Sequence, residues 1–450
     1  MRSWICLLFI VNSAVADQLH EGADWPNWRG PFYNGSAVAN DLPTKFSPTE
    51  NVRWKLSLPG PAGSTPIVFG DHVLLTSFDS KSGNVLGIAL DRTTGKIRWQ
   101  HDLGKGKSET TPGMENYMAC PSPVTDGKII VFHTGRGELV ALDYLGNLNW
   151  RTNIQQTYGD FNYMWGYSSS PLLLEGRLFI QILHRDEPYP EQQVAKLNPD
   201  SLFVALDAST GKELYCHLRP TDAVGETREA YSTPIPRQVN GETEIVVLGG
   251  DYVTAHKPET GQELWRHGDW NPGKKTFWRT VPCPVVVGNF VLTSAPHYGP
   301  VSAVDLSGES PHVRWSFEKR TTDTPTPLVY KNRLYILHGR RRELTCLDLE
   351  SGRVLRQSRL PGQRYLRSSP TAADDKIFLM DVDGDVLVCA AHTDKEGADQ
   401  QASQQADREV PEFELLQHTR FGGYPARSTI AIAHNQLFIR TSEAIYCIGK

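Results

Sequence analysis

The sequence predicts an all-β chain that folds as an eight-bladed β-propeller, in which four-stranded antiparallel sheets close into a ring. Three observations lead to this fold class. The chain has 450 residues, which is too long for one ordinary compact core. A unit of roughly 40 to 60 residues recurs along it, a length typical of propeller blades. The last unit lacks one strand, and the chain start has a spare strand that can complete it.

Residues 120–154 show the unit in full, as CPSPVTDGKIIVFHTGRGELVALDYLGNLNWRTNI. Four short apolar runs are separated by DG, GRG and YLGN, because Gly, Asn and Asp tolerate the positive φ of tight turns. Each unit is therefore expected to form four antiparallel strands. Most units open on small polar residues and a proline, which limits extension of the first strand, while the small residues let eight strands converge.

The other units follow the same plan. They cover residues 64–99, 169–215, 232–265, 283–315 and 325–356, with a seventh from Ser368 and an eighth from Arg427 to the chain end. The eighth unit has no fourth strand, and NVRWKLSL at residues 51–58 is a spare one. Pairing of residues 51–58 beside residues 445–447 closes the ring and removes two exposed sheet edges. A parallel solenoid is the alternative, and the complementary chain ends favour the ring.

The outer strand of most units carries a large side chain that can fill the wedge between neighbouring sheets. This side chain is tryptophan in five units and is replaced in two, and the set is Trp54, Trp99, Trp150, Trp265, Trp315, Tyr215 and Arg356. The seams at Tyr215 and Arg356 are expected to be weaker.

Three cysteines occupy the third-strand position where other units have alanine. Cys346, Cys389 and Cys447 lie in TCLD, VCAA and YCIG, in the place that Ala141 takes in VALD. Cysteine then serves as a small apolar filler, and mostly free, buried thiols are expected. Equivalent positions on neighbouring sheets should lie beyond the ~7 Å Cα limit for a disulfide, so none is expected among these three.

The N-terminal residues 1–16 combine a positive start, the apolar run WICLLFIV and the small residues AVA. They predict a cleavable signal peptide, with a buried strand as the alternative. A lead-in segment at 17–50 and one propeller domain at 51–450 follow, with a polar insertion at about 391–411. The mature protein is then soluble, and periplasmic or extracellular.

Charge and hydropathy exclude two classes of partner. The net charge is −5, whereas a general nucleic-acid binder needs a basic face. No stretch after residue 16 approaches the ~20 apolar residues of a membrane span. We expect a monomer without nucleic-acid partners and without a membrane span.

The segments before the inner strands hold the concentrated chemistry. Inner strands begin near the propeller axis, so side chains distant in sequence should meet at the mouth of the central channel. Stacking faces beside cations suit a planar or anionic small ligand, and the alternative is that the aromatic residues only plug a solvated funnel. The candidate ligand-binding residues are Tyr117, Trp165, Tyr167, Arg228, Tyr231, Trp278, Arg279, Tyr365, Arg367, Tyr424 and Arg427.

The repeated pattern A-L-D-x-x-T-G-x-x-x-W resembles the tryptophan-docking repeat of the PQQ-like (pyrroloquinoline quinone repeat) β-propeller family. The lead-in DWPNWRGPFYNGSA at residues 24–37 is similar to the N-terminus of secreted bacterial members. The resemblance covers about residues 50–450 and extends, more distantly, to BamB-like propellers and quinoprotein alcohol dehydrogenases. It implies the closed ring of sheets already expected from the repeats.

The resemblance implies two functions. The preferred one is an exported, non-catalytic binding scaffold without a cofactor, which binds a protein partner or a small anionic or planar ligand at the channel mouth. BamB-type lipoproteins bind partner proteins in this way, but here Cys6 lies inside the apolar run and not just after a cleavage point, so a lipid anchor is not expected. The second function is a dehydrogenase that uses PQQ and calcium on alcohols or sugars.

The dehydrogenase would need a catalytic aspartate and a calcium site. Asp323 is the acidic residue in a plausible mouth position. No Glu-Asn-Asp metal set and no adjacent cysteine pair can be assigned, so no metal ligand is predicted. DVDGD at residues 381–385 resembles the start of a calcium loop, but it falls where a hairpin turn is needed and lacks the closing glutamate, so a turn is expected.

Overall fold

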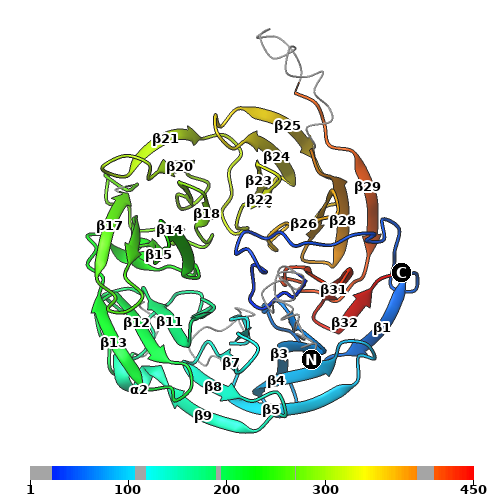
Figure 1. Cartoon of the computed structure of the whole chain (residues 1–450), viewed down its shortest axis with the longest axis horizontal. Coiled ribbons are helices and arrows are strands. Elements are labelled where there is room, and N and C mark those ends of the chain that lie inside the picture. The colour runs from blue at the N-terminus through cyan, green and yellow to red at the C-terminus, as the bar shows by residue number, and fades with distance from the viewer. Residues whose placement is uncertain (1–22, 107–117, 189–193, 269, 393–409) are drawn as a thin grey trace, which may run out of the picture.

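The computed structural model describes residues 23–106, 118–188, 194–268, 270–392 and 410–450. Eight four-stranded antiparallel sheets stand around a central axis as the blades of a propeller (Figure 1). Helical structure in these ranges is limited to α2 (Ile154–Tyr158) and a 3-10 turn, η1 (Gly225–Arg228). The prediction of an all-β, eight-bladed propeller is confirmed.

Blades 1 to 7 each run along the chain from the innermost to the outermost strand. Blade 1 consists of β2 (Ile67–Phe69), β3 (His72–Asp79), β4 (Asn84–Asp91) and β5 (Ile97–Lys105). Blade 2 consists of β6 (Val124–Thr125), β7 (Ile130–His133), β8 (Glu138–Leu142) and β9 (Leu148–Asn153). Blade 3 consists of β10 (Leu172–Leu174), β11 (Arg177–Ile182), β12 (Leu202–Asp207) and β13 (Glu213–Leu218). Blade 4 consists of β14 (Ile235–Val239), β15 (Glu242–Gly249), β16 (Tyr252–His256) and β17 (Glu263–Gly268).

Blade 5 consists of β18 (Val285–Val287), β19 (Phe290–Ser294), β20 (Val301–Asp305) and β21 (His312–Phe317). Blade 6 consists of β22 (Leu328–Tyr330), β23 (Arg333–His338), β24 (Glu343–Asp348) and β25 (Val354–Arg359). Blade 7 consists of β26 (Thr371–Ala373), β27 (Lys376–Met380), β28 (Asp385–Ala390) and β29 (Leu415–Arg420).

Blade 8 joins the two ends of the chain. Its inner strands are β30 (Ala431–Ala433), β31 (Gln436–Arg440) and β32 (Ala444–Ile448), and its outer strand is β1 (Val52–Ser57). In the antiparallel pairing Trp54 lies opposite Cys447 and Leu56 opposite Ile445. Figure 1 shows the blue β1 beside the red β32. The predicted closure of the ring by the N-terminal strand is therefore confirmed.

The outer-strand tryptophans dock onto the next blade. The indole N–H of Trp54 donates to the carbonyl of Arg92, with an N···O distance of 2.7 Å. Gly95, in the same turn, has a φ of +69°, and a Cβ there would lie 2.5 Å from the Trp54 ring, so both conformation and space require glycine. The same donor–carbonyl bond joins Trp99 to Tyr144 (3.2 Å), Trp150 to Ala208 (2.8 Å), Tyr215 to Pro258 (3.1 Å) and Trp315 to Leu349 (2.9 Å).

One outer-strand tryptophan bonds differently. The indole N–H of Trp265 donates to the Glu244 carboxylate in its own blade, at 3.1 Å. Arg356 donates to the carbonyl of Glu412, which precedes the outer strand of the next blade, at 2.8 Å. Tyr215 and Arg356 thus both keep a donor–carbonyl bond to the next blade, and the expected weakness of their seams stays a prediction.

All six cysteines of the described chain are free. Cys346, Cys389 and Cys447 lie on the third strands β24, β28 and β32 and are buried, as the repeat predicts. They face outer-strand residues where the other blades pair alanine with a large side chain, as Ala89 does with Trp99. The pairing explains why only small residues fit there.

We expect all six cysteines of the described chain to react with a thiol reagent when the protein is denatured without a reductant. The thiols are separate in the fold, and burial raises the pKa of Cys389 to about 12, which keeps it protonated and unreactive in the native state. Titration of the native and the denatured protein checks this. A shortfall in the denatured protein that a reductant restores would show that disulfides form.

The lead-in segment, residues 23–46, crosses the ring near its centre (Figure 1, dark blue). Trp25 exchanges backbone hydrogen bonds with Val68 of blade 1 at 2.8 and 2.9 Å, and Ala37 donates to Ala372 of blade 7 at 3.0 Å. Arg29 is only 1% exposed and donates to the carbonyls of Pro327 (3.0 Å) and Pro370 (3.2 Å), which precede the inner strands of blades 6 and 7. The segment thus ties distant blades together across the axis.

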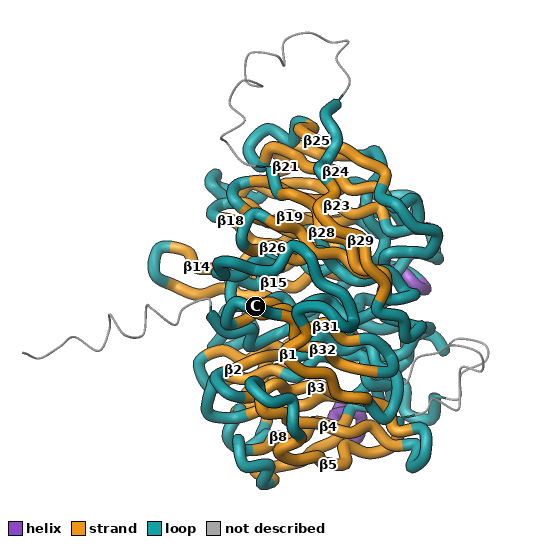
Figure 2. The backbone as a smooth tube through the Cα atoms, turned by 90° about the vertical axis from the view of Figure 1, so that its right-hand side faces the viewer, coloured by secondary structure: helices purple, strands orange, loops and turns teal. Residues whose placement is uncertain are grey.

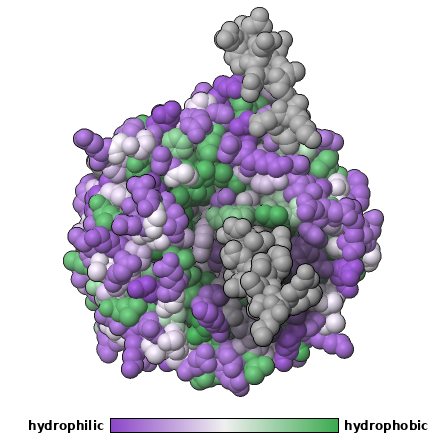
Figure 3. Space-filling model, in the orientation of Figure 1, coloured by the Kyte–Doolittle hydropathy of each residue, from purple (hydrophilic) through white to green (hydrophobic). Residues whose placement is uncertain are grey.

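The two faces of the ring differ in outline. Figure 2 shows the blades edge-on, with the β14–β15 hairpin projecting from the face that Figure 1 presents to the viewer. On that face apolar side chains gather toward the inside, while the periphery is mainly hydrophilic (Figure 3). Among the described residues, no helix has the length and apolar character needed to cross a bilayer.

Candidate functional site

Each blade has a small residue just before its innermost strand, in most blades directly before a proline. This residue links neighbouring blades around the axis. Its side chain accepts the backbone N–H of the equivalent residue in the preceding blade. The bonds run from Thr65 to Ser122 (2.9 Å), Ser122 to Ser170 (2.9 Å), Ser170 to Thr233 (3.2 Å), Thr233 to the Cys283 thiol (2.9 Å), Cys283 to Thr326 (2.9 Å), Thr326 to Ser369 (2.9 Å) and Thr429 to Thr65 (3.3 Å). These seven bonds join the starts of the inner strands around the ring from blade 8 through blade 1 to blade 7, whereas the sequence pattern predicted only a steric role for these small residues.

Above this ring lies a cavity of about 870 Å³, to which all eight blades contribute. Trp28 of the lead-in segment also lines it. Eight of the sequence-predicted residues line the cavity: Trp165, Tyr231, Arg279, Asp323, Tyr365, Arg367, Tyr424 and Arg427. The structure thus brings together side chains that are far apart in the sequence, at the place where the inner strands begin.

The other predicted residues lie elsewhere. Tyr167 is 1% exposed and packs in an aromatic cluster with Tyr163 and Tyr231. Arg228 is turned toward Asp186, at 3.5 Å, and donates to a backbone carbonyl, and Trp278 stacks on His297 with ring centroids 5.4 Å apart. Tyr117 lies outside the described residues.

Several lining residues were not predicted from the sequence. Tyr298 and Arg340 come from the loops that join the second and third strands of blades 5 and 6, and Cys120 precedes the inner strand of blade 2. Arg340 stands in the basic run GRRR, a signal that could have been used. Trp28 stands in a segment that no repeat governs, so nothing in the sequence placed it at the axis.

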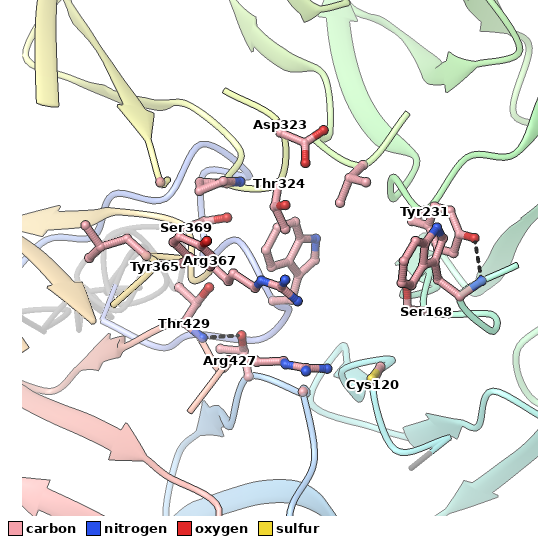
Figure 4. A pocket seen from close by; sticks show the side chains of 18 of the residues that line it. Cys120, Ser168, Tyr231, Asp323, Thr324, Tyr365, Arg367, Ser369, Arg427 and Thr429 are labelled. Carbon is pink, nitrogen blue, oxygen red and sulfur yellow. Dashed lines mark hydrogen bonds between the residues drawn. The ribbon is translucent and has the colours of Figure 1, made fainter. Parts of the chain in front are cut away.

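Four arginines line the cavity, Arg279, Arg340, Arg367 and Arg427, and the last two act on each other electrostatically. Arg367 and Arg427 come from blades 7 and 8 and point into the same space (Figure 4). Burial, followed by the nearby guanidinium of Arg427, lowers the pKa of Arg367 below its usual value. A lowered pKa means that the positive charge is incompletely compensated by the protein, so an anion placed between these groups would be stabilised.

Trp165 and Arg279 form a separate wall of the cavity. The Arg279 guanidinium lies over the Trp165 ring, 5.6 Å from its centroid, and Trp165 Nε1 donates to Glu226 at 3.1 Å. Arg279 also pairs with Asp323, at 3.3 Å between Nη2 and Oδ2. Trp165 remains 39% exposed in the cavity, so this wall offers a stacking face with a cation held in place.

The carboxylates near the cavity give little support for a cation site. Across the described ranges, no three histidine, cysteine or acidic side chains gather closely enough to hold a metal ion. In DVDGD, Asp381 Oδ1 accepts the N–H groups of Asp383 and Asp385, and Oδ2 pairs with Arg342 at 2.8 Å. These bonds occupy the carboxylate, and the segment is the expected turn between β27 and β28.

Several solved structures have a similar fold. They include BamB from Moraxella catarrhalis (TM-score 0.58, 13% identity, covering 89% of this chain and 99% of that one) and a europium-containing methanol dehydrogenase (TM-score 0.66, 11% identity, 96% and 92%). A quinohemoprotein alcohol dehydrogenase from Comamonas testosteroni gives a TM-score of 0.66 at 10% identity, covering 98% and 83%. At these identities the similarity establishes the fold alone. No curated protein matches the sequence.

The family comparison is more specific. A family model described as outer membrane protein assembly factor BamB matches residues 44–181 and 88–358, two overlapping stretches that together span more than half of the chain. The same stretches contain all five outer-strand tryptophans and the turn glycines Gly95, Gly211 and Gly261. The protein therefore belongs to the PQQ-like β-propeller family represented by that BamB model.

Proposed function

We propose that the protein is an exported, non-catalytic binding propeller that holds a small anionic ligand with a planar body in its central cavity. The observation that carries the proposal is the convergence of Arg367 and Arg427 in a space lined by aromatic side chains. Charge-assisted bonds from guanidinium groups are about twice as strong as neutral ones and favour carboxylate or phosphate groups. The proposed export rests on the signal-peptide pattern of residues 1–16, which lie outside the described part of the chain.

The lead-in segment supports the same proposal. Trp28 lines the cavity, and Arg29 beside it is held by carbonyls of blades 6 and 7. A segment fixed in this way holds the Trp28 side chain at the cavity as a preformed aromatic face, which suits a ligand-binding pocket. Tyr365 and Tyr424, 45% and 55% exposed, stand at the cavity as further stacking faces.

A dehydrogenase that uses PQQ and calcium fits the described residues less well. Calcium takes six to eight oxygen ligands. The acidic residue that lines the described cavity is Asp323, and its carboxylate is paired with Arg279. The residues present do not form a calcium site, so we derive no reaction step through that cofactor. Binding of a protein partner, as the BamB relationship suggests, remains the second candidate, because large propeller faces can serve it without the cavity.

The test is calorimetric titration with naphthalene-2,6-dicarboxylate, a planar dianion, with its dimethyl ester as the uncharged control. We expect the dianion to bind and the ester to bind weakly. Replacing Arg367 and Arg427 together by alanine should weaken the dianion by about 100-fold, because two charge-assisted contacts are lost. The melting temperature should change little, since both side chains face the cavity and not the core.

The matched control is the double variant Arg341→Ala and Arg359→Ala. Both residues are exposed and neither lines the cavity, so the change in net charge is the same. Unchanged affinity in the control assigns the loss to the site. Equal losses of affinity in both double variants would show that the loss follows from the net charge of the protein, and this would contradict the proposal.

A further inference from the structure

A buried carboxylate stands behind the Trp165 wall of the cavity. Glu229 is 0% exposed and lies between blades 3 and 4. Its Oε1 pairs with Arg185 Nε at 2.5 Å, and its Oε2 accepts the hydroxyl of Tyr231 at 2.5 Å and the backbone N–H of Met164 at 3.0 Å. One side chain thus holds groups from three separate segments.

These contacts reach the cavity through Tyr231. The Tyr231 hydroxyl donates to Glu229 and accepts the backbone N–H of Trp165 at 3.1 Å, a bond drawn in Figure 4. Trp165 in turn supports Arg279. The position of the stacking wall therefore depends on a chain of hydrogen bonds that starts at the Glu229 carboxylate, although Glu229 does not line the cavity.

The Glu229 carboxylate can gain or lose a proton near neutral pH. Burial raises the pKa of Glu229 to about 7, against the hydrogen bond from Tyr231 and the charge of Arg185, which favour the ionised form. Glu226 adds to the increase, and Tyr163, whose pKa is itself raised by burial, completes the titratable groups around the carboxylate. A modest change of pH would thus convert Glu229 between an acceptor of two hydrogen bonds and a neutral acid.

We propose that Glu229 is the positioning residue of the Trp165–Arg279 wall, and that its ionisation couples binding of a planar ligand to pH. This inference deepens the proposed function and rests on it. The ionised carboxylate accepts the Tyr231 hydroxyl, which leaves the phenolic oxygen free to accept from Trp165. The protonated acid must itself donate, loses the ion pair with Arg185 and competes with Trp165 for the Tyr231 oxygen, so the wall loosens.

Two probe ligands separate the positioning of the Trp165–Arg279 wall from the effect of charge in the cavity. Naphthalene-2,6-dicarboxylate needs the stacking wall, whereas sulfate needs only Arg367 and Arg427 on the opposite side of the cavity. Both probes stay ionised through the relevant range. Protonation of Glu229 makes the cavity more positive and should favour both anions equally, but only the planar probe should suffer from a loosened wall.

The experiment is calorimetry of both probes at about two pH units below and above the Glu229 pKa, where the group is almost fully protonated or ionised. Relative to sulfate, the planar probe should bind about fivefold more weakly in acid, the equivalent of one net hydrogen bond. In Glu229→Gln, and in Tyr231→Phe, which breaks the link to Trp165, this ratio should no longer depend on pH. Glu244→Gln is the control, because Glu244 also pairs with a buried arginine, Arg237 at 3.0 Å, but lies away from the cavity.

The outcomes distinguish the two proposals. If both probes bind and their ratio is constant with pH in the wild-type protein, the role of Glu229 is wrong and the binding site stands. If neither probe binds at any pH, the proposed function fails, and the inference fails with it. A ratio that still varies with pH in Glu229→Gln would assign the effect to another group, and one that still varies in Tyr231→Phe would contradict the link through Tyr231.

Discussion

Replacing Trp99 with alanine is expected to lower the free energy of unfolding by about 3–5 kcal/mol, the usual cost of truncating a large packed aromatic residue. The Trp99 indole fills the seam between blades 1 and 2 and donates to Tyr144 in blade 2 at 3.2 Å. Gly146 of that turn has a φ of +87°, and a Cβ there would lie 2.7 Å from the indole, so this turn has no side chain to fill the space that alanine leaves.

Urea unfolding of the variant followed by circular dichroism measures this effect. Phe277→Ala is the control, because Phe277 is 70% exposed and its removal should change the free energy by less than about 0.5 kcal/mol. A loss below about 1 kcal/mol for Trp99→Ala would mean that the docking tryptophans contribute little to closure of the ring.

Replacing Arg29 with alanine is expected to cost about 3 kcal/mol of unfolding free energy and to impair ligand binding. The substitution leaves the buried carbonyls of Pro327 and Pro370 without donors, and each such group costs about 1–3 kcal/mol. Removing a buried cation offsets part of this cost, because burial lowers the pKa of Arg29 to about 10 and so disfavours its charge. The lead-in segment should then be held less firmly against blades 6 and 7, so that Trp28 loses its fixed place at the cavity.

Arg53→Ala is the matched control. Arg53 also donates to a backbone carbonyl, that of Lys450 at 2.7 Å, but it is exposed on β1, so its carbonyl can be hydrated after the change. We expect a change within about 0.5 kcal/mol for Arg53→Ala. Similar losses for both variants in chemical denaturation would contradict the view that Arg29 anchors the lead-in segment to blades 6 and 7.

The fold could be predicted from the sequence because each blade repeats the same local rules. Turn glycines such as Gly95 and Gly211, third-strand residues such as Ala89 and outer-strand tryptophans recur at fixed spacing. The missing strand of blade 8 and the spare strand around Trp54 then specified how the ring closes. Local propensity, hydrophobic pattern and turn chemistry all pointed to the same answer, which is the condition for a reliable prediction.

The site could be predicted only in part, because it depends on the direction in which each side chain points, and the spacing of residues in the sequence does not encode that direction. Arg367 and Arg427 precede inner strands and reach the axis, as expected. Tyr167 and Arg228 stand in equivalent segments but turn into the aromatic cluster or toward Asp186. Trp28 reaches the cavity through a segment without repeats, and the role of Glu229 follows from hydrogen bonds that no motif announces.

The fold by itself leaves the function open. The similar structures include a BamB and two alcohol or methanol dehydrogenases, so one propeller serves unrelated tasks. The proposed function rests on the content of the cavity, which holds Arg367 and Arg427, a wall of Trp165 and Arg279, and Trp28 from the N-terminal segment. The proposed function therefore requires that a ligand binds inside this cavity.

The most direct measurement is a crystal structure of the protein soaked with a bromine-substituted naphthalene-2,6-dicarboxylate, with the bromine located by its anomalous scattering. We predict one strong peak inside the central cavity, with a carboxylate of the probe contacting Arg367 and Arg427 and its ring beside Trp28 or Trp165. Peaks confined to the outer rim of the blades, with the cavity holding only solvent, would contradict the account and would favour a protein-binding scaffold.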